Sequence, residues 1–358
     1  MARCLTASEA AVALAAEHLA HHGLVAFPTE TVYGLGADAL SAEAVAKIFQ
    51  AKGRPTDHPL IVHVATAGAA QALAGHWPVA AQCLASAFWP GPLTLIVQKA
   101  ESVPLAVTGG QVSVGLRVPS HPVAQALLKA FSVLGSGALA APSANPFGKL
   151  SATRAADVMD QLSHRLAADD LVLDGGPCTD GIESTVVDCT GYSPRILRPG
   201  ALGRTAIAAA LSAQGIELAA PLDLSAEADA VQGQAAVRDR PDTPSAPMPR
   251  VSGSLASHYA PRTPLWVLPA QALRQQLDQY LRENPGAQLA VWMFSDWADA
   301  PEGVHYERAP EDATVYGRAL YARLNDWDSA GFSLLCLERP PQTPEWEAVQ
   351  DRLRRAAF

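Results

Sequence analysis

Short apolar runs alternate with helical segments along most of this chain, and this alternation restricts the possible folds more than any other feature. The runs 24–28, 59–64 and 93–98 have the length and composition of buried strands, and Ser41 is a suitable N-cap for a helix over 42–53. Strands interleaved with helices are typical of α/β and α+β domains. The chain is therefore predicted to form an α/β fold around a mixed sheet.

The same alternation continues through residue 215. We expect further strands within 112–119, 138–145, 171–176, 184–189 and 195–200. We expect helices over the N-terminal segment 1–23, from Ala155 to about Arg165 with Ser151 or Thr153 as its cap, and over 205–215. Together these elements provide enough strands for one large sheet.

A change of composition at about 218–262 divides the chain. Pro, Ala, Asp and Ser dominate this stretch without apolar periodicity, which is typical of a linker, although its end SGSLASHYAP is unusually specific for a spacer. Three apolar runs and two helical segments follow, and they predict a small three-layer α/β unit. We therefore expect a large domain at 1–212, a linker at 213–262 and a small domain at 263–358.

Composition and charge exclude several classes of protein. The net charge of −9 is unsuited to coating nucleic acid non-specifically, and the acidic excess lies mainly after residue 212. The five cysteines are scattered without a CxxC pair, which argues against a disulfide framework and a zinc site. There is no signal-peptide pattern and no apolar run near the ~20 residues that span a bilayer, so we expect a cytoplasmic protein.

One loop combines two cations with backbone-restricting residues. Lys52 and Arg54 flank Gly53, and Pro55 follows, between a predicted helix and a predicted strand. An ammonium and a guanidinium group at this spacing suit a phosphate or a carboxylate. The alternative is a solvated surface loop, which would not need the control of the backbone that Gly53 and Pro55 provide.

Two further segments contain polar residues next to apolar strands. Ser143, Asn145 and Ser151 follow the run at 138–142, where hydroxyls and backbone N–H groups can cradle phosphate oxygens, although a simple turn is the alternative. Arg117 lies within an otherwise apolar strand. A buried charge is costly unless it is paired, so Arg117 is predicted to point into a cleft, with an outward-facing position as the alternative.

Other chemistries lack their sequence signatures. His63 lies in an apolar run and, taken alone, is more typical of a core residue than of a ligand; the ten histidines include no convincing metal spacing. Neither GxxxxGK[ST] nor GxSxG is present. GLGADA (34–39) loosely matches a dinucleotide motif, but TETVY separates it from the preceding strand, which argues against a nicotinamide enzyme.

Six motifs occur in one order across residues 24–200: FPTETVYGLG, KGRPTDHPLIVHV, WPGPLTLIV, LRVPSHP, APSANPFGKLS and DGGPCTDGIESTVVD followed by ILRPG. This set closely resembles the YrdC family, whose hallmark corresponds here to the Lys-x-Arg pair Lys52 and Arg54 and the Ser-x-Asn pair Ser143 and Asn145. The HYAP sequence at 258–261 and the small C-terminal domain resemble the longer, two-domain threonylcarbamoyl-AMP synthases. The resemblance implies an open, twisted mixed sheet with a large concave site in the 1–212 domain.

The resemblance also implies an activity. Such a nucleotidyltransferase joins L-threonine, bicarbonate (or CO2) and ATP into L-threonylcarbamoyladenylate and pyrophosphate, for the N6-threonylcarbamoyladenosine modification of tRNA. Mg²⁺ is expected with the ATP phosphates and no protein metal site is expected. The implied partners are downstream tRNA-modification proteins, with no membrane and no stable bulk nucleic-acid binding.

The resemblance assigns candidate roles to individual residues. Threonine would contact Thr31, His63, Arg117, Ala141 and Ser184, with its carboxylate on Arg117. ATP would be bound by Lys52, Arg54, His58, Ser113, Ser143, Asn145, Ser151, Arg198 and Tyr259, and Lys52 and Arg54 would also act in catalysis. His58 stands where the family commonly has Asn. The linker end, with His258 and Tyr259, is a candidate lid over the site.

Two rival functions remain at this point. An RNA-binding module would fit a concave, locally basic surface, but the near-neutral first domain and the acidic remainder speak against it. A carbamoyl-transfer enzyme of hydrogenase maturation contains a YrdC-like part within a longer chain. That rival would require zinc-finger cysteine pairs and an acylphosphatase-like segment, which are absent from this sequence.

Overall fold

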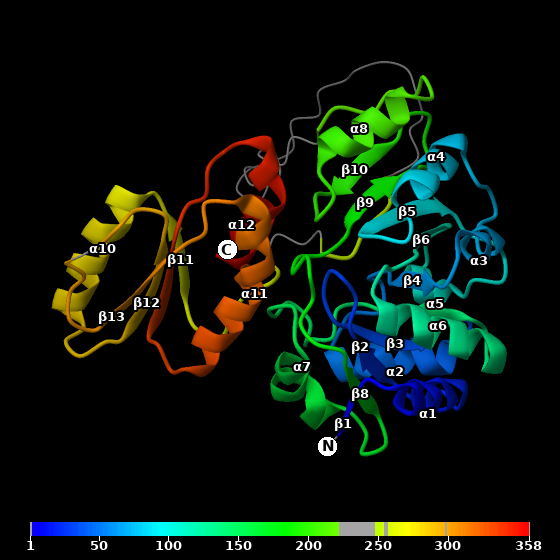
Figure 1. Ribbon diagram of the computed structural model, residues 1–358, viewed down its shortest axis with the longest axis horizontal. Helices are drawn as coiled ribbons and strands as arrows, with labels where there is room; N and C mark the ends of the chain where they lie inside the picture. The colour runs from blue at the N-terminus through cyan, green and yellow to red at the C-terminus, as the bar shows by residue number, and fades with distance from the viewer. Residues whose placement is uncertain (1, 222–247, 254–256, 298, 358) are drawn as a thin grey trace.

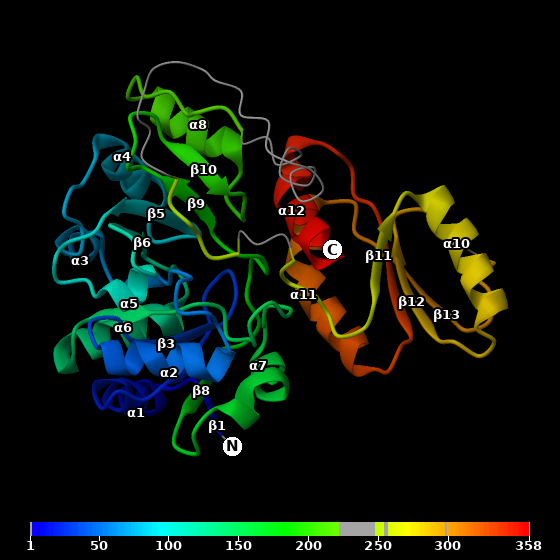
Figure 2. The ribbon, with the colours of Figure 1, turned by 180° about the vertical axis from the view of Figure 1, so that it is seen from behind.

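The structure, a computed structural model, describes residues 2–221, 248–253, 257–297 and 299–357 (Figure 1). Its strands form a ten-stranded sheet in the order β1-β8-β2-β3-β7-β4-β6-β5-β9-β10 and a separate four-stranded sheet in the order β11-β14-β12-β13. The two sheets belong to two α/β domains that lie side by side, as both views show (Figures 1 and 2). Part of the expected linker at 213–262 lies outside the described residues.

The strands of the larger sheet are Arg3–Thr6 (β1), Val25–Phe27 (β2), Gly34–Asp38 (β3), Ile61–Val64 (β4), Leu93–Gln98 (β5), Ser113–Arg117 (β6), Ala138–Ala140 (β7), Leu171–Asp174 (β8), Thr185–Asp188 (β9) and Arg195–Arg198 (β10). Its helices are Glu9–Ala20 (α1), Ala42–Lys52 (α2), Ala67–Ala72 (α3), Val79–Phe88 (α4), Leu105–Thr108 (α5), Pro122–Leu134 (α6), Ala155–Leu162 (α7) and Arg204–Ser212 (α8). The smaller sheet comprises Leu265–Leu268 (β11), Leu289–Met293 (β12), Val304–Arg308 (β13) and Leu334–Glu338 (β14), with helices Ala270–Glu283 (α10), Ala313–Ser329 (α11) and Glu347–Ala356 (α12).

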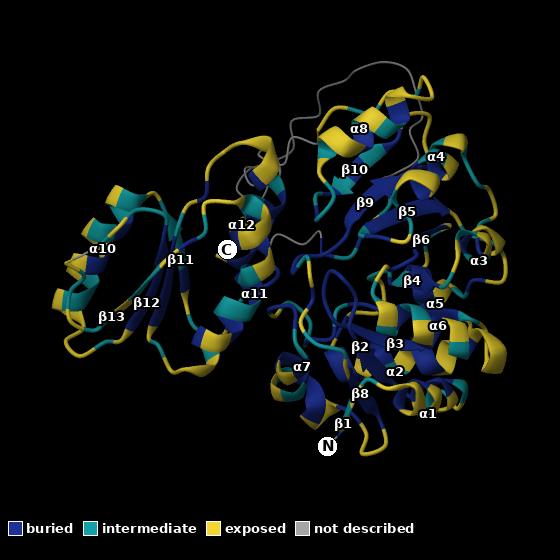
Figure 3. Ribbon diagram, in the orientation of Figure 1, coloured by how far each residue is buried: buried dark blue, intermediate teal, exposed yellow. Residues whose placement is uncertain are grey.

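The larger sheet is mixed and has a different cover on each face. Strands β1, β8 and β2 run parallel, whereas β3 and β7 pair antiparallel with their neighbours. On one face, helices α1 and α6 bury an apolar cluster with residues such as Phe27, Leu139 and Leu173. The helices expose only their outer sides, and the strands between them are buried (Figure 3). The expected α/β fold with an open mixed sheet is confirmed.

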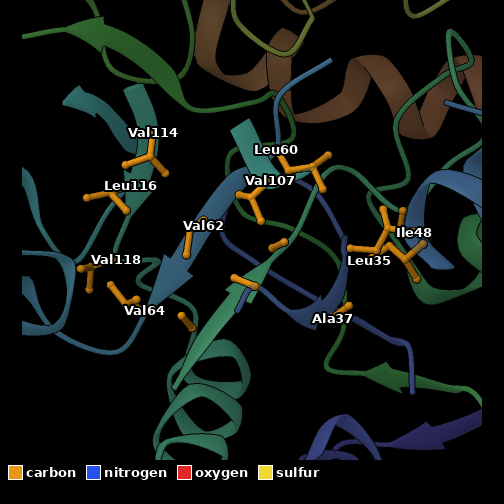
Figure 4. Packing of buried hydrophobic residues seen from close by; sticks show 14 of the residues in the cluster. Leu35, Ala37, Ile48, Leu60, Val62, Val64, Val107, Val114, Leu116 and Val118 are labelled. Carbon is orange, nitrogen blue, oxygen red and sulfur yellow. The ribbon is translucent and has the colours of Figure 1, made fainter. Parts of the chain in front are cut away.

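The opposite face holds the main core of this domain. Figure 4 shows Val62 and Val64 of β4 close to Leu116 of β6 and to Val118, which follows this strand, within that cluster. Because side chains alternate across a strand, the residues between them point to the other face of the sheet. This alternation places His63 on the face of the sheet opposite the Val62 and Val64 core, where the candidate site lies.

The smaller domain has the three layers that the sequence predicted. Along its parallel strands, Leu289, Val291 and Met293 pack with α10, while Ala290 and Trp292 pack with α11 and α12. Strands buried on both faces are typical of parallel sheets. Helices α11 and α12 lie on the side that faces the larger domain, and α10 lies on the outer side (Figures 1 and 2).

The two domains also share buried apolar contacts. One cluster joins Val32, Leu150 and Ile182 of the larger domain to Tyr321 and Val349 of the smaller one. A common core of this kind favours a fixed arrangement over free domain motion. Among the described residues, no helix is long and apolar enough to cross a membrane.

Two local expectations were wrong, and a strand that borders the site was not expected. The segment 1–23 is a strand followed by a helix, because Ser8 caps α1 and the preceding residues pair with β8. The GLGAD segment is strand β3, paired with β2 and β7, and was not anticipated as a strand. Helix α7 is capped at Arg154, not at Ser151 or Thr153, because the Asp157 carboxylate accepts the N–H groups that open the helix.

The turn after α5 requires glycine for two separable reasons, which gives a matched pair of variants. Both Gly109 and Gly110 have positive φ, but a Cβ on Gly109 would lie 2.3 Å from the carbonyl oxygen of Asp57, whereas a Cβ on Gly110 meets nothing within 4 Å. We expect Gly110→Ala to lower the free energy of unfolding by about 1 kcal/mol, from conformational strain alone. Gly109→Ala should cost at least about 2 kcal/mol more, because the Asp57 loop must move. Urea unfolding of both variants measures the difference, and equal losses would contradict the steric argument.

Candidate functional site

A small cavity lies where β4, β6 and the loops after β7 and before β9 meet the segment that precedes the C-terminal domain. Its volume of about 40 Å³ admits only a few water molecules. Several of the candidate residues border it together: Thr31, His63, Arg117, Ala141, Ser143, Ser184, Arg198 and Tyr259. The other candidates, Lys52, Arg54, His58, Ser113, Asn145 and Ser151, lie outside its lining.

Strand register explains why residues distant in sequence reach this cavity. His63 of β4 pairs with Arg117 of β6, so both side chains occupy the face opposite the Val62 and Leu116 core. Ser113 stands on the same face of β6, and with Ile61 it borders an adjoining cavity of about 20 Å³. The candidate ATP contact Ser113 therefore lies next to the main cavity.

Arg117 is buried and paired, as its sequence position predicted. Its Nη2 lies 2.8 Å from Oε1 of Glu30, and both side chains are almost fully buried. Burial opposes the ionisation of Glu30, but the charge of Arg117 outweighs it and lowers the pKa of Glu30. Burial and the Arg117 charge also lower the pKa of His63 to about 3, so this imidazole is neutral near pH 7.

Lys52 is buried beneath the loop that follows β7. Its Nζ donates to the carbonyl oxygens of Ser143, at 2.6 Å, and of Asn145. Burial, with a contribution from the charge of Arg54, lowers the pKa of Lys52 well below its ordinary value. The ammonium is therefore held close to the candidate phosphate loop by neutral acceptors, which leave its charge unpaired.

Arg54 and His58 meet at the ring of Phe147. The guanidinium carbon of Arg54 lies 5.4 Å from the ring centroid, and the imidazole of His58 lies edge-on at 5.2 Å. Arg54 also donates to the carbonyl oxygen of Pro59 and, at 3.2 Å, to Oγ of Ser252. Arg54 is thus positioned between the expected ATP loop and the linker segment.

Asn145 and Ser151 hold the same loop in place. The Asn145 amide donates to the carbonyl oxygens of Pro146 and Lys149, so this side chain closes the turn on itself. Ser151 donates its hydroxyl to Glu183 at 2.6 Å. In this conformation both candidate ATP contacts have protein partners.

Arg198 connects the sheet to the linker. Its guanidinium donates to the carbonyl oxygen of Ser184 at 2.9 Å and to that of Ser252 at 2.8 Å. The Ser184 hydroxyl lies 2.8 Å from that of Thr94 and 3.2 Å from Arg198 Nη2. Ser252 therefore receives hydrogen bonds from both Arg54 and Arg198, the two arginines expected to hold phosphates.

The His258–Tyr259 pair closes the cavity from the linker side. Both residues border the cavity and are almost fully buried, and Tyr259 has the unusual φ of 64°. Burial lowers the pKa of His258 to about 3, so the ring is neutral near pH 7. Among the residues expected to contact ATP, Tyr259 is the one that comes from the linker, and it borders the cavity.

Unused polar atoms indicate that the site is built to accept a ligand. Arg54 Nε, Arg117 Nε, Asn145 Oδ1, His258 Nδ1 and the Tyr259 hydroxyl are buried and have no hydrogen-bond partner among the described residues. Buried polar groups without partners are rare in native proteins because each is costly. Those of Arg117, His258 and Tyr259 border the cavity, and Arg54 and Asn145 hydrogen-bond to residues that border it, so the site offers hydrogen-bonding groups to a ligand.

Sequence reasoning missed several residues at this site. Glu30 and Glu183 are the carboxylates that balance its cations, and Arg352 of the C-terminal domain reaches Glu183. Glu30 and Glu183 lie inside two of the six motifs. They could have been identified by asking which carboxylates in those motifs pair with the buried arginines. Ser252 and Arg352 carried no comparable signal.

Fold and site together define a class: a mixed-sheet domain with a buried cationic cavity, closed by a linker and joined to a small three-layer domain. The Sua5/YciO/YrdC family model, described as "Telomere recombination", matches residues 17–200. The model described as "Threonylcarbamoyl-AMP synthase, C-terminal domain" matches residues 212–358. The chain belongs to the two-domain Sua5 branch of the YrdC family.

Curated relatives and a solved structure agree with this placement. The chain is 36% identical to the threonylcarbamoyl-AMP synthase of Pyrococcus abyssi, over 97% of this chain and 94% of the relative. It is 34% identical to that of Bacillus subtilis, over 99% of this chain and 94% of the relative. The crystal structure of P. abyssi Sua5 complexed with L-threonine superposes with a TM-score of 0.80 at 33% identity, covering 100% and 97% of the two chains.

The charge of Glu183 gives a pH-dependent prediction for stability. Burial raises the pKa of this carboxyl, but the charges of Arg352 and Arg198 outweigh burial and lower it to about 2. The folded pKa is below the ordinary value of about 4.3, so the stabilisation is complete above pH ~5 and is lost as pH falls toward 2.

We therefore expect Glu183→Gln to lower the free energy of unfolding by about 3 kcal/mol at pH 7, because it removes the buried carboxylate that pairs with Arg352 between the two domains and leaves Asp351 as the remaining charged partner. The difference from the wild type should shrink at pH 3. Urea unfolding at several pH values measures it, with the exposed Glu101→Gln as control. A difference that does not change with pH would contradict the assignment of a buried, ionised Glu183.

Proposed function

We propose that this chain synthesises L-threonylcarbamoyladenylate and pyrophosphate from L-threonine, bicarbonate (or CO2) and ATP, for the N6-threonylcarbamoyladenosine modification of tRNA. Family membership and full-length relatives that carry the synthase name support this activity. The observation that carries the proposal is the buried Arg117, which borders the cavity with the other residues expected to contact threonine. Downstream tRNA-modification proteins would receive the product.

In this proposal threonine occupies the Arg117 end of the cavity. The unused Nε of Arg117 is a donor for the substrate carboxylate, beside the group already paired with Glu30. His63 is neutral, and its Nδ1 donates to the carbonyl oxygen of Ile61 at 3.3 Å, so its Nε2 is left to accept a hydrogen bond from the substrate. Thr31, Ser184 and Ala141 form the remaining wall. A small polar amino acid suits a wall made of hydroxyls and a methyl group.

ATP would lie toward Lys52, Arg54 and Arg198. The loop of Ser143 and Asn145, with Ser113 and Ser151 nearby, would supply hydroxyl and amide groups to phosphates and ribose, and Tyr259 would cover the nucleotide. Of these side chains, Arg54, Arg198 and Ser151 now donate to Ser252 or Glu183, so nucleotide binding would replace those contacts. His58, beside Phe147, is the candidate in place of the usual Asn.

The chemistry requires positioning and charge neutralisation. The threonine amine attacks the carbon of CO2 and loses a proton, which gives a carbamate. A carbamate oxygen then attacks the α-phosphorus as the bond to the pyrophosphate oxygen breaks. Lys52 and Arg54 would stabilise the negative charge that develops on the phosphates, and a dry cavity would protect the labile product.

Mg²⁺ belongs to this proposal as part of the nucleotide substrate. Among the described residues, no three His, Cys, Asp or Glu side chains gather as a metal site. The carboxylates nearest the cavity, Glu30 and Glu183, are already paired with Arg117 and Arg352. The chain's donor set therefore suits a metal that arrives on the ATP phosphates, where it would neutralise their charge.

The deciding experiment is pyrophosphate release with ATP, bicarbonate and each amino acid in turn. We expect release that depends on both threonine and bicarbonate. Release without threonine would overturn the substrate assignment. Salt-dependent tRNA binding without ATP consumption would favour an RNA-binding module instead.

Arg117→Lys tests the carboxylate contact. Lysine keeps the charge but lacks the planar fork, so kcat/KM for threonine should fall by about tenfold to a hundredfold while KM for ATP changes little. Steady-state pyrophosphate release measures both constants. Arg195→Lys, on β10 away from the cavity lining, is the matched control. An equal rise in KM for threonine and ATP would show that Arg117 does not select the amino acid.

Deletion of residues 250–262 tests the linker as a lid. Ser252, His258 and Tyr259 border the cavity, so their removal should expose it to water and sharply reduce synthesis. The larger domain should keep its fold, because its sheet and both helical faces are complete without this segment. Circular dichroism checks the fold, and unchanged synthesis would eliminate the lid.

A further inference from the structure

Helix α12 of the C-terminal domain delivers a fully buried arginine to the candidate site. Arg352 is 0% exposed and is the largest fully buried side chain among the described residues. A buried guanidinium is costly unless its charge and its N–H groups find partners. The partners of Arg352 therefore indicate what this position requires.

Those partners include residues of the site in the other domain. Arg352 Nε donates to Glu183 Oε2 at 2.6 Å, and Nη1 donates to Asp351 Oδ2 at 2.7 Å. Its guanidinium carbon lies 5.2 Å from the centroid of the Tyr259 ring, within the range of a cation–π interaction. One side chain thus contacts the carboxylate beside Ser184 and the aromatic residue that closes the cavity.

Glu183 connects Arg352 to the wall of the cavity. Its other oxygen accepts the hydroxyl of Ser151, and Oε2 also accepts the hydroxyl of Tyr321 at 3.2 Å. Glu183 borders the cavity itself and immediately precedes Ser184, whose hydroxyl and carbonyl are held by Arg198. A shift of Glu183 would therefore move a candidate threonine contact and a candidate ATP contact together.

The linker segment is attached to the same helix. The N–H of His258 donates to the carbonyl oxygen of Arg355 at 3.1 Å, and the N–H of Ala260 donates to that of Gly148 at 2.9 Å. Between them Tyr259 holds a left-handed conformation that a tyrosine rarely adopts without support from its surroundings. The guanidinium group of Arg352, which lies over the Tyr259 ring, and the hydrogen bond from His258 to Arg355 of α12 provide that support.

We propose that Arg352 is a positioning residue through which the C-terminal domain fixes Glu183 and the His258–Tyr259 pair in the closed site. The proposal deepens the proposed synthase function and rests on it for its kinetic part. The C-terminal domain then completes the catalytic cavity, and Arg352 acts through Glu183 and Tyr259 without touching a substrate.

The test compares full-length Arg352→Met with the wild type by hydrogen–deuterium exchange and by pyrophosphate release. Methionine keeps much of the apolar stem but removes the fork and the charge. We expect amide exchange in the 257–261 peptide to accelerate at least about tenfold, because the His258 and Ala260 hydrogen bonds open more often. We expect kcat to fall by about tenfold to a hundredfold, with KM for threonine within about threefold. The reason is that Glu183 and Tyr259 would no longer be held in the positions that they have in the closed site.

Two further variants keep the result interpretable. Arg354→Gln is the matched control, because Arg354 is on the same helix and pairs with the same Asp351, but its side chain is 54% exposed. It should leave exchange and kcat unchanged. Arg352→Lys, which keeps the charge without the fork, should give intermediate values, and it replaces Arg352→Met if that variant fails to fold.

The outcomes separate this inference from the proposed function. Unchanged exchange at 257–261 in the Arg352 variants would overturn the anchoring. Faster exchange with an unchanged kcat would overturn the positioning role. If the wild type releases no pyrophosphate with threonine, the proposed function fails, and the exchange comparison still decides whether Arg352 holds the segment.

Discussion

Burial of several positive charges around one small cavity is the constraint on which the rest of this structure depends. Lys52, Arg54, Arg117 and Arg198 are each at most 6% exposed, and Arg352 joins them from the second domain. Their mutual repulsion is strong in a medium of low dielectric constant. Two buried carboxylates, Glu30 and Glu183, offset part of it through direct ion pairs with Arg117 and Arg352.

The remaining cations are satisfied by neutral acceptors. Lys52 donates to the carbonyl oxygens of Ser143 and Asn145, and Arg198 to those of Ser184 and Ser252. A carbonyl oxygen meets the hydrogen-bonding needs of a cation without cancelling its charge. The cavity therefore keeps a positive potential, and the unpartnered Nε atoms of Arg54 and Arg117 remain as donors for a ligand. This is the condition under which a phosphate or a carboxylate gains most by entering, because the binding groups are already in position.

Local signals predicted the elements whose ends and faces are encoded in neighbouring residues. Ser41 caps α2 as expected, this helix ends one residue before the end of the predicted range 42–53, and β5 occupies the predicted range 93–98. Strand β3 escaped notice because its glycines disfavour strands; Gly36 is required there by the close approach of the Phe27 ring, which depends on strand pairing. At the site, the need of Arg117 for a partner was predictable. Arg352 was not, because its partner Glu183 lies 169 residues away in the other domain.

The size of the cavity completes the mechanistic argument. A space of about 40 Å³ cannot hold a nucleotide, and Ser252 now takes hydrogen bonds from Arg54 and Arg198. The linker segment thus occupies the place where the proposal puts the phosphates, with its own carbonyl and hydroxyl oxygens as neutral substitutes. Entry of ATP would exchange these weak acceptors for charged oxygens, which bind the same arginines more strongly. In the structure the segment contacts the larger domain at Ser252 and the C-terminal domain at His258 and Tyr259. Under the proposed function, nucleotide entry would replace the contacts at Ser252, whereas the contacts with the C-terminal domain would not need to change.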